Sequence, residues 1–248
     1  MAVSRRGYIF SAFLLGVLCV LLIVVSIASD SWVVSTARAP HHERDSNIRY
    51  GLFRGEMSIY ELATPDINTL YMTCTAEFNA CALSCKTEQE ARLIEETSNM
   101  LGKKPVITFA FYVSVLVILF LQLAFAVTAA ALAIINATKN PTEPVFGLPG
   151  CLWSNVITAI LGSTVLLMFG IYWATSGLKD HLAVSYIAIG LFVPAPSLGY
   201  SYWVLITAVL CSLANIGLIQ GRAYLLEKNP PPSTIKLENH SDGTIFLY

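Results

Sequence analysis

Four long apolar runs constrain this chain more than any other feature. They cover Tyr8–Ala28, Val106–Ile135, Leu148–Ala174 and Ser201–Gly221, and almost no ionisable side chain lies inside them. Each run reaches the roughly 20 residues that a helix needs to cross about 30 Å of hydrocarbon. A helix also satisfies its own backbone hydrogen bonds in lipid. The sequence therefore predicts an all-α membrane protein built as a four-transmembrane-helix bundle.

The composition agrees with a membrane bundle and argues against a nucleic-acid partner. The 248 residues are 55% hydrophobic and 12% charged, whereas a soluble domain carries about twice that charged fraction. The formal net charge of -1 gives no basic surface for nucleic acid. The first apolar run exceeds the roughly 7–15 residues of a signal-peptide core, so we expect it to stay in the protein as a helix.

Lysine and arginine residues near the ends of the runs predict the orientation, because short cytoplasmic flanks are enriched in them. The basic residues on one side are Arg5, Arg6, Lys139, Arg222 and Lys228. The segment between the third and fourth runs has only Lys179. Both termini are therefore predicted to be cytoplasmic. The cytoplasmic segments are 1–7, 136–147 and a disordered tail, 222–248; the extracellular loops are 29–105 and 175–200.

The first outer loop contains segments with strand composition. These are Ile48–Phe53 and Met57–Tyr60, with Gly51 and Gly55 as breaks. Gly51 is expected where the chain needs an unusual backbone angle or a close approach between strands. Thr87–Leu101 is predicted to form a helix. In the second outer loop, the apolar run Ile187–Val193 precedes Pro194 and Pro196, and we expect it to lie on the membrane or on the first loop. Trp32, just after the first run, is expected to be an interfacial anchor.

The six cysteines fall into two groups. Cys19, Cys151 and Cys211 lie in or near the apolar runs and are expected to be packing thiols, whereas Cys74, Cys81 and Cys85 lie in the first outer loop. Three cysteines in an oxidising compartment are most simply one disulfide and one spare thiol.

Polar residues within the runs are neutral and favour helix packing over transport. They are Gln122, Asn155, Asn215 and Gln220. Such side chains hydrogen-bond between helices, while a transporter or proton relay normally carries an ionisable group there. Gly217 and Gly221 form a GxxxG pattern, which is typical of close helix packing within a bundle or between copies. We expect packing inside the bundle, because four helices must pack in any case. No catalytic, phosphate-binding or metal-ligand motif stands out, so we expect no enzyme, cofactor or metal.

Motifs spread along the whole chain resemble the clarin family. Trp32 is followed by the segment Tyr50, Gly51, Leu52, Phe53, Arg54 and Gly55, which resembles the clarin Y-G-L-F-x-G motif. Residues 147–150 and 179–182, Tyr202-Trp203-Val204 and the terminal Leu247-Tyr248 are also similar to clarin segments. A wider resemblance is to claudin-like tetraspans, although Phe53 stands where claudins have tryptophan.

The resemblance implies a fold and a function. In claudin-like proteins the first loop forms a small antiparallel sheet carrying a disulfide. Cys74 and Cys85 have roughly the claudin-like separation, with Cys81 as the alternative partner. The clarin resemblance implies a non-enzymatic organiser of plasma or vesicle membranes in sensory cells, linked to actin and to calcium-channel placement. The alternatives are an auxiliary subunit of an ion channel, like the claudin-like gamma subunits, and a cell-junction protein.

The C-terminal tail offers one further partner. Phe246, Leu247 and Tyr248 end the chain after Pro230–Pro232. A PDZ domain binds a free C-terminal carboxylate by adding the peptide as a strand to its sheet. The open alternative is a disordered end with no partner. We otherwise expect membrane lipids, membrane proteins and scaffold proteins as partners.

Overall fold

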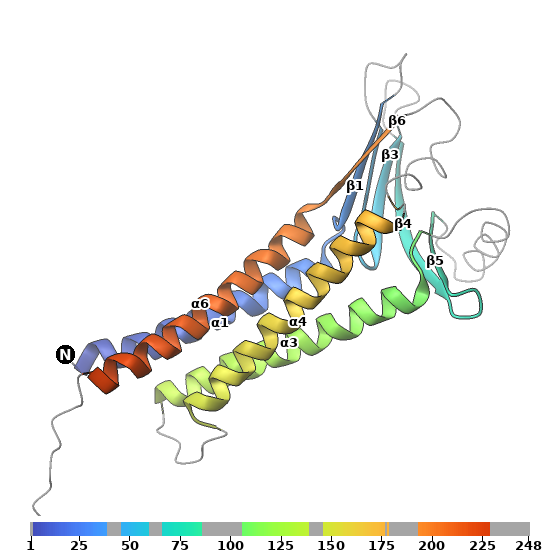
Figure 1. Cartoon of the computed structure of the whole chain (residues 1–248). Coiled ribbons are helices and arrows are strands. Elements are labelled where there is room, and N and C mark those ends of the chain that lie inside the picture. Colours follow the sequence, from blue (N-terminus) through green and yellow to red (C-terminus); the bar gives the residue numbers. More distant parts are fainter. Residues whose placement is uncertain are drawn as a thin grey trace, which may run out of the picture.

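Four long helices form the membrane-type part of the molecule. The computed structural model describes residues 2–38, 46–59, 66–85, 106–138, 146–176, 178 and 193–228. Its long helices are α1 (Ala2–Ala28), α3 (Phe109–Thr138), α4 (Leu148–Thr175) and α6 (Tyr200–Lys228) (Figure 1). All four are long and apolar enough to cross a membrane, as predicted.

The bounds of three helices differ clearly from those predicted. Helix α1 begins at Ala2, six residues before the predicted Tyr8. Helix α3 runs from Phe109 to Thr138 and is shifted by three residues from the predicted 106–135. Helix α6 continues to Lys228, so residues 222–228, predicted to be disordered tail, are helical. Hydropathy reports where a helix crosses lipid, but a helix continues past the lipid until its sequence stops it.

The four helices pack as a ring. Helix α1 contacts α3 and α6, and α4 contacts the same two helices from the other side. Small side chains allow the close approach: Ala126, Ala129, Ala130 and Ala133 of α3 are all buried. A Cβ on Gly16 of α1 would lie 3.4 Å from the Cα of Ala130. Small residues at helix contacts are the usual means of close packing in lipid.

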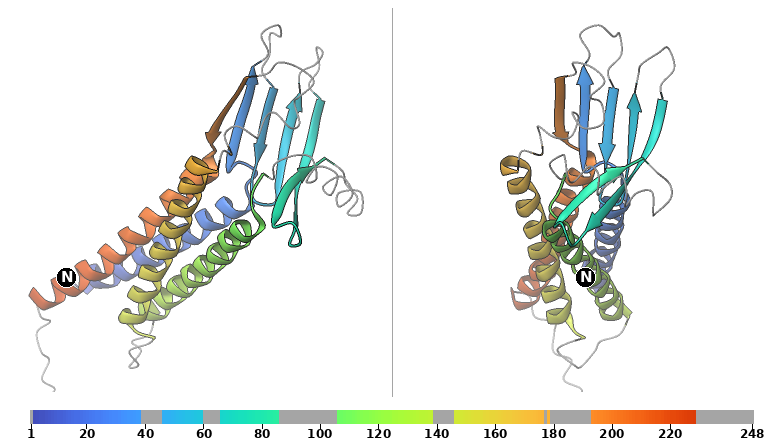
Figure 2. Two further views of the ribbon diagram at one scale, coloured as in Figure 1. Left: turned by 45° about the vertical axis from the view of Figure 1, so that its right-hand side comes forward. Right: turned by 90° about the vertical axis from the view of Figure 1, so that its right-hand side faces the viewer.

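A six-stranded antiparallel sheet projects from one end of the ring (Figures 1 and 2). Its strands are β1 (Val33–Arg38), β2 (Ser46–Tyr50), β3 (Arg54–Ile59), β4 (Asp66–Thr75), β5 (Ala80–Ser84) and β6 (Val193–Leu198). Their order is β5-β4-β3-β2-β1-β6. Strand β2 buries Ser46, Ile48 and Tyr50 and exposes the residues between them, the alternation expected of a strand with one covered face. Strands β2 and β3 overlap the two expected segments, but β2 ends at Tyr50 and not at Phe53, and Gly55, expected to be a break, lies inside β3. The other four strands were not expected.

Strand β6 comes from the second loop and was not predicted. Residues 187–192 of the expected apolar run lie outside the described part of the chain, but Val193–Leu198 pairs with β1, placing Pro194 opposite Ala37 and Pro196 opposite Ser35. Gly199 donates its backbone N–H to the carbonyl of Trp32 (2.9 Å). Counting back from Gly199, every second residue of β6 forms backbone hydrogen bonds with β1. Pro194 and Pro196 lie at the positions between them, so their nitrogens point to the outer edge of the sheet.

Prolines are tolerated at such an edge, where no hydrogen bond of the sheet is lost. They also leave this edge without donors at two successive outward positions, which discourages addition of a further strand. At the opposite edge, Cys81 donates its N–H to the carbonyl of Ile107 (2.8 Å) and accepts from Val106 (3.1 Å). The segment entering α3 therefore covers part of β5.

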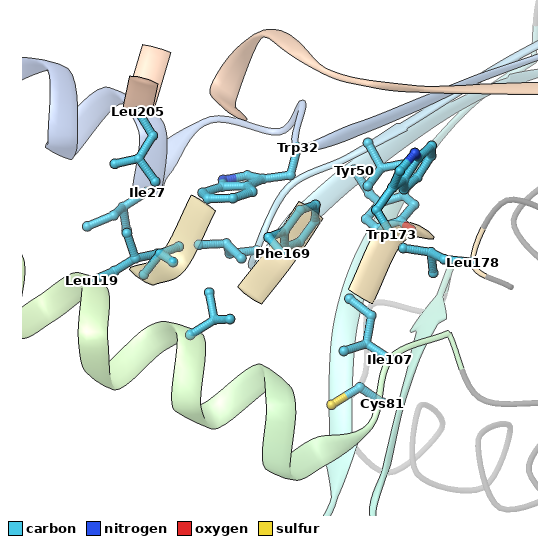
Figure 3. Packing of buried hydrophobic residues seen from close by; sticks show 14 of the residues in the cluster. Ile27, Trp32, Tyr50, Cys81, Ile107, Leu119, Phe169, Trp173, Leu178 and Leu205 are labelled. Carbon is cyan, nitrogen blue, oxygen red and sulfur yellow. The ribbon is translucent and has the colours of Figure 1, made fainter. Parts of the chain in front are cut away.

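The sheet and the helices share one hydrophobic core. Figure 3 shows Trp32 and Tyr50 from the sheet side packed around Phe169 and Trp173 of α4. The same cluster continues into the sheet through Val33, Ile48, Met57, Leu70 and Leu83, and into the bundle through Ile23, Leu119 and Leu205. Because one continuous cluster of buried side chains joins the two parts, we expect the sheet to keep its orientation on the bundle.

Candidate functional site

The candidate site is the junction between the sheet and the bundle, centred on the segment Ser29–Trp32 between α1 and β1. Trp32 donates its N–H to the carbonyl of Tyr50 (2.9 Å). Gly199 and Ser201 donate to the carbonyls of Trp32 (2.9 Å) and Ser31 (3.1 Å). The segment that follows α1 is therefore hydrogen-bonded to the end of β2 on one side and to the start of α6 on the other.

Two glycines enclose this segment. A Cβ on Gly51 would fall on the carbonyl oxygen of Ser29 and 2.9 Å from the Cα of Asp30. A Cβ on Gly199 would fall on the carbonyl oxygen of Ser31 and 2.6 Å from its carbonyl carbon. Gly51 does make a close backbone approach, although to the connection after α1 and not to a neighbouring strand as expected. Gly199 was missed, because a single glycine after a proline-containing segment is an ordinary loop signal.

Trp32 is a core residue, and its predicted role as an interfacial anchor is wrong. Its side chain is 1% exposed, and its ring meets Phe169 edge-on with centroids 4.9 Å apart. The indole Nε1–H donates to the carbonyl of Ser26 (2.8 Å). That carbonyl lies in the last turn of α1, where helix carbonyls lack partners within the helix. The indole of Trp32 therefore provides a hydrogen-bond donor for a carbonyl at the end of α1, and its ring packs against α4.

Aromatic residues of α3 and α4 complete the junction. Tyr112 donates its hydroxyl to the carbonyl of Leu52 (2.8 Å), and the backbone N–H of Thr108 donates to the hydroxyl of Tyr172 (3.1 Å). Phe111 stacks on Tyr172 with ring centroids 4.1 Å apart. The start of α3 is thereby bonded to the β2–β3 turn and to the end of α4.

Of the six residues of the predicted motif, four meet in the junction, Gly55 is buried in the sheet beside it, and Phe53 lies on the surface. Trp32, Tyr50, Gly51 and Leu52 meet in the junction, where the three side chains are buried. Gly55 lies in β3, where a Cβ would come within 2.6 Å of both the carbonyl oxygen of Arg49 and the Cβ of Tyr50. Phe53 is exposed. Burial raises the pKa of Tyr50 well above its usual range, with nearby Tyr172 adding to the shift, so the phenol stays neutral.

The disulfide joins Cys74 to Cys81, not to Cys85 as the claudin resemblance implied. Cys74 and Cys81 are register partners in β4 and β5, with Cα atoms 4.0 Å apart. Cys85 follows the end of β5, where Ser84 already stands opposite Tyr71. Cys85 is therefore at the other end of the strand pair from Cys74. Spacing along the chain could not show this, because the register depends on the turn that joins the strands.

Removing the disulfide is expected to destabilise the sheet. Cys74→Ser and Cys81→Ser should each lower the stability by about 2–3 kcal/mol, since the bond closes a small loop and limits the unfolded chain. The two variants should behave alike, and Cys85→Ser should be milder. Thermal unfolding of the purified protein measures the loss, and a non-reducing peptide map identifies the bond. A map that shows Cys74 bonded to Cys85 would contradict the pairing.

The polar residues of the helices play different parts. Asn215 donates from Nδ2 to Oδ1 of Asn155 (3.1 Å), and Asn155 donates to the carbonyl of Cys151 (2.8 Å). The first bond links α6 to α4, as predicted, and the second lies within α4 and holds the Asn155 side chain in place. Gln220 is exposed on α6. Gln122 is fully buried, and neither its amide nitrogen nor its oxygen has a hydrogen-bond partner among the described residues. A Cβ on Gly162 would lie 2.5 Å from that nitrogen.

Gln122→Met is expected to stabilise the bundle by about 1–2 kcal/mol. Methionine fills a similar volume, and an unpaired amide buried in the helix bundle is unfavourable. The matched control is Asn155→Leu, which removes the partner of Asn215 and should lower stability. Thermal unfolding in nanodiscs measures both. A loss of stability in Gln122→Met would show that the Gln122 amide is hydrogen-bonded when the protein is in the bilayer.

The GxxxG glycines do not pack within the bundle. A Cβ on Gly217 or Gly221 would meet no atom within 4 Å. Both lie on the open side of α6, beside the exposed Leu210 and Leu213. The predicted packing inside the bundle is therefore wrong, and contact between copies or with another protein stays a prediction.

Some predicted features lie outside the described residues. They are the helix at Thr87–Leu101 and the PDZ-type end at Phe246, Leu247 and Tyr248. Among the residues that the structure describes, no group of three or more histidine, cysteine, aspartate or glutamate side chains is arranged to hold a metal ion.

Comparison with protein-family models found no match for this chain, and comparison with curated proteins found none either.

Proposed function

We propose that this protein is a non-enzymatic tetraspan organiser of the clarin type, which uses its sheet to hold another membrane protein. The observation that supports this is the shared core of sheet and bundle, centred on Trp32 and Phe169. A sheet fixed in this way presents its outer face at a constant angle to the bilayer. Pre-organised surfaces bind with less loss of conformational freedom than mobile ones.

The outer face of β2 carries polar side chains, which suit a reversible contact. Asn47 and Arg49 point outward from β2, and Arg49 forms an ion pair with Glu56 of β3 (2.6 Å). The hydrogen bond to Glu56 raises the pKa of Arg49. Ala195 and Ser197 extend the exposed face across β6. Because prolines protect the β6 edge, the partner contacts the face of the sheet and does not add a strand there.

Partner capture with a face variant tests this proposal. Proximity labelling from the C-terminus would compare wild type with Arg49→Glu, which reverses the charge beside Glu56, and with Leu210→Ala, an exposed apolar position on α6. In the Arg49→Glu variant, the labelling of at least one membrane partner should fall by about tenfold. A loss of about 1.4 kcal/mol of binding free energy has this effect. Leu210→Ala should retain it. Equal capture by all three proteins would overturn the use of this face.

The second candidate is an auxiliary subunit of an ion channel. It is favoured by the open glycines of α6, because a helix of a pore-forming subunit can approach closely over Gly217 and Gly221. The two proposals separate experimentally. Co-purification with a pore-forming subunit that is lost in Gly217→Leu and retained in Arg49→Glu favours the auxiliary subunit. The reverse pattern favours the organiser.

The location and orientation are also proposals. The basic flanks support a plasma or vesicle membrane protein with both termini in the cytoplasm, and α1 begins at the end of the bundle opposite the sheet (Figure 1). An epitope tag at either terminus should be undetected in unpermeabilised cells, whereas a tag between β3 and β4 should be detected. Surface detection of the terminal tags would reverse the orientation. The C-terminal residues 246–248 remain a proposed ligand for a PDZ scaffold.

A further inference from the structure

Two phenylalanine side chains are exposed on turns of the sheet. Phe53 lies in the β2–β3 turn and is 41% exposed, and Phe78 lies in the β4–β5 turn and is 51% exposed. The residue next to each phenylalanine is held in place by the fold. Leu52 is buried, and Asn79 adopts a left-handed backbone conformation (φ 46°) that asparagine tolerates better than most residues.

Hydrogen bonds place both turns beside the first turn of α3. Asn79 accepts from the backbone N–H of Ala110 through Oδ1 (3.0 Å) and from that of Phe109 through its carbonyl (3.2 Å). It therefore caps α3, whose first N–H groups have no partner within the helix. Tyr112, in the same turn of α3, bonds to the carbonyl of Leu52. Figure 2 shows the β4–β5 hairpin beside the start of α3.

The length of α3 sets the depth of these turns in the membrane. Its 30 residues extend about 45 Å, close to the roughly 40–45 Å of a bilayer with its headgroups. The first turn of α3 therefore lies in the headgroup layer on the side of the sheet. Exposed aromatic residues of α6, Tyr200 and Trp203, lie at the same end of the bundle. Phe53 and Phe78 thus continue an aromatic belt that already belongs to the lipid-facing surface.

We propose that Phe53 and Phe78 insert into the lipid leaflet on the side of the sheet. The occupant of this surface is the boundary between headgroups and acyl chains, where aromatic side chains partition well. The sheet is then held to the membrane by two turns as well as by the helices. This anchoring is independent of any protein partner and of the proposed organiser function.

Photocrosslinking to lipid tests the insertion directly. The photoreactive amino acid p-benzoylphenylalanine would replace Phe53 or Phe78, one at a time, in protein reconstituted into phosphatidylcholine nanodiscs. The matched control is Ile67, which is 59% exposed at the start of β4, far from its membrane-side end. Phe120 on α3, which is exposed among the membrane helices, gives the positive reference. Intact-protein mass spectrometry measures the lipid adduct.

Adducts at positions 53 and 78 should exceed that at position 67 by at least about fivefold and approach that at position 120. An adduct at either turn no larger than at position 67, or a protein adduct in its place, would overturn the proposal. Should a photoreactive variant fail to fold, Phe78→Trp in nanodiscs of brominated phosphatidylcholine gives a second measurement. Its added fluorescence should be quenched by the bromine atoms, and fluorescence that is not quenched would equally refute insertion.

Discussion

Replacing Gly51 by alanine is expected to prevent the sheet from seating on the bundle. The new Cβ would fall on the carbonyl oxygen of Ser29 and 2.9 Å from the Cα of Asp30. Both atoms belong to the backbone, so no side-chain rotation relieves the overlap. Inserting atoms into a packed site typically costs about 1–3 kcal/mol, and a collision with backbone belongs at the upper end or beyond. Purified Gly51→Ala should show a loss of about 3 kcal/mol or more in thermal unfolding and reduced surface expression.

Two other glycines make this test specific. Gly199→Ala should be as damaging, because its Cβ would meet the carbonyl of Ser31 on the other side of the same segment. Gly217→Ala should be harmless or slightly stabilising, since its Cβ has open space and alanine favours the helix. If Gly51→Ala reached the surface at the level of Gly217→Ala, the enclosure of Ser29–Trp32 would not be needed for the fold.

The helices were predictable because their signal is local. An apolar run of about 20 residues has few other stable forms than a membrane helix, whatever surrounds it. The helix ends were predicted less well, since α3 and α6 continue beyond the positions where hydropathy changes. Strand β2 was recognisable in part from its strand-type composition, although it begins two residues earlier and ends three residues earlier than expected.

The junction could be predicted only in part, because its features depend on contacts between distant segments. Strand β6 joins β1 across more than 150 residues of chain, and its prolines argue against a strand unless its edge position is known. The disulfide depends on the register of β4 against β5. Trp32 follows a membrane helix, a position typical of an interfacial anchor, and only Phe169 and the carbonyl of Ser26 reveal it as a core residue.

Gln122 shows a different limit of sequence reasoning. A neutral polar residue in a membrane helix predicts a hydrogen bond to a neighbouring helix. Asn155 and Asn215 follow this expectation, whereas the amide of Gln122 packs over Gly162 instead. The residue type was the same kind of signal in each case. What differs is the neighbour on the facing helix, and only the packing of α3 against α4 determines that.

Trp32→Ala should destabilise the protein by about 3–5 kcal/mol, the range for removing a large buried aromatic side chain. The change empties the space against Phe169 and leaves the carbonyl of Ser26 without the indole donor. Trp32→Phe keeps much of the aromatic contact and loses the hydrogen bond, so its loss should be nearer 1–2 kcal/mol. Thermal unfolding in nanodiscs, with the fluorescence of the remaining tryptophans as a second probe, measures both variants.

Trp203→Ala provides the matched control for this series. Trp203 is 59% exposed at the start of α6, outside the core, so its replacement should lower the stability by less than about 1 kcal/mol. The order of stability should therefore be Trp203→Ala, then Trp32→Phe, then Trp32→Ala. A loss in Trp32→Ala of less than about 1 kcal/mol, as small as that expected for Trp203→Ala, would mean that Trp32 is not a core residue. In that case the sheet would not share a core with the bundle, and the fixed orientation on which the organiser proposal depends would fail.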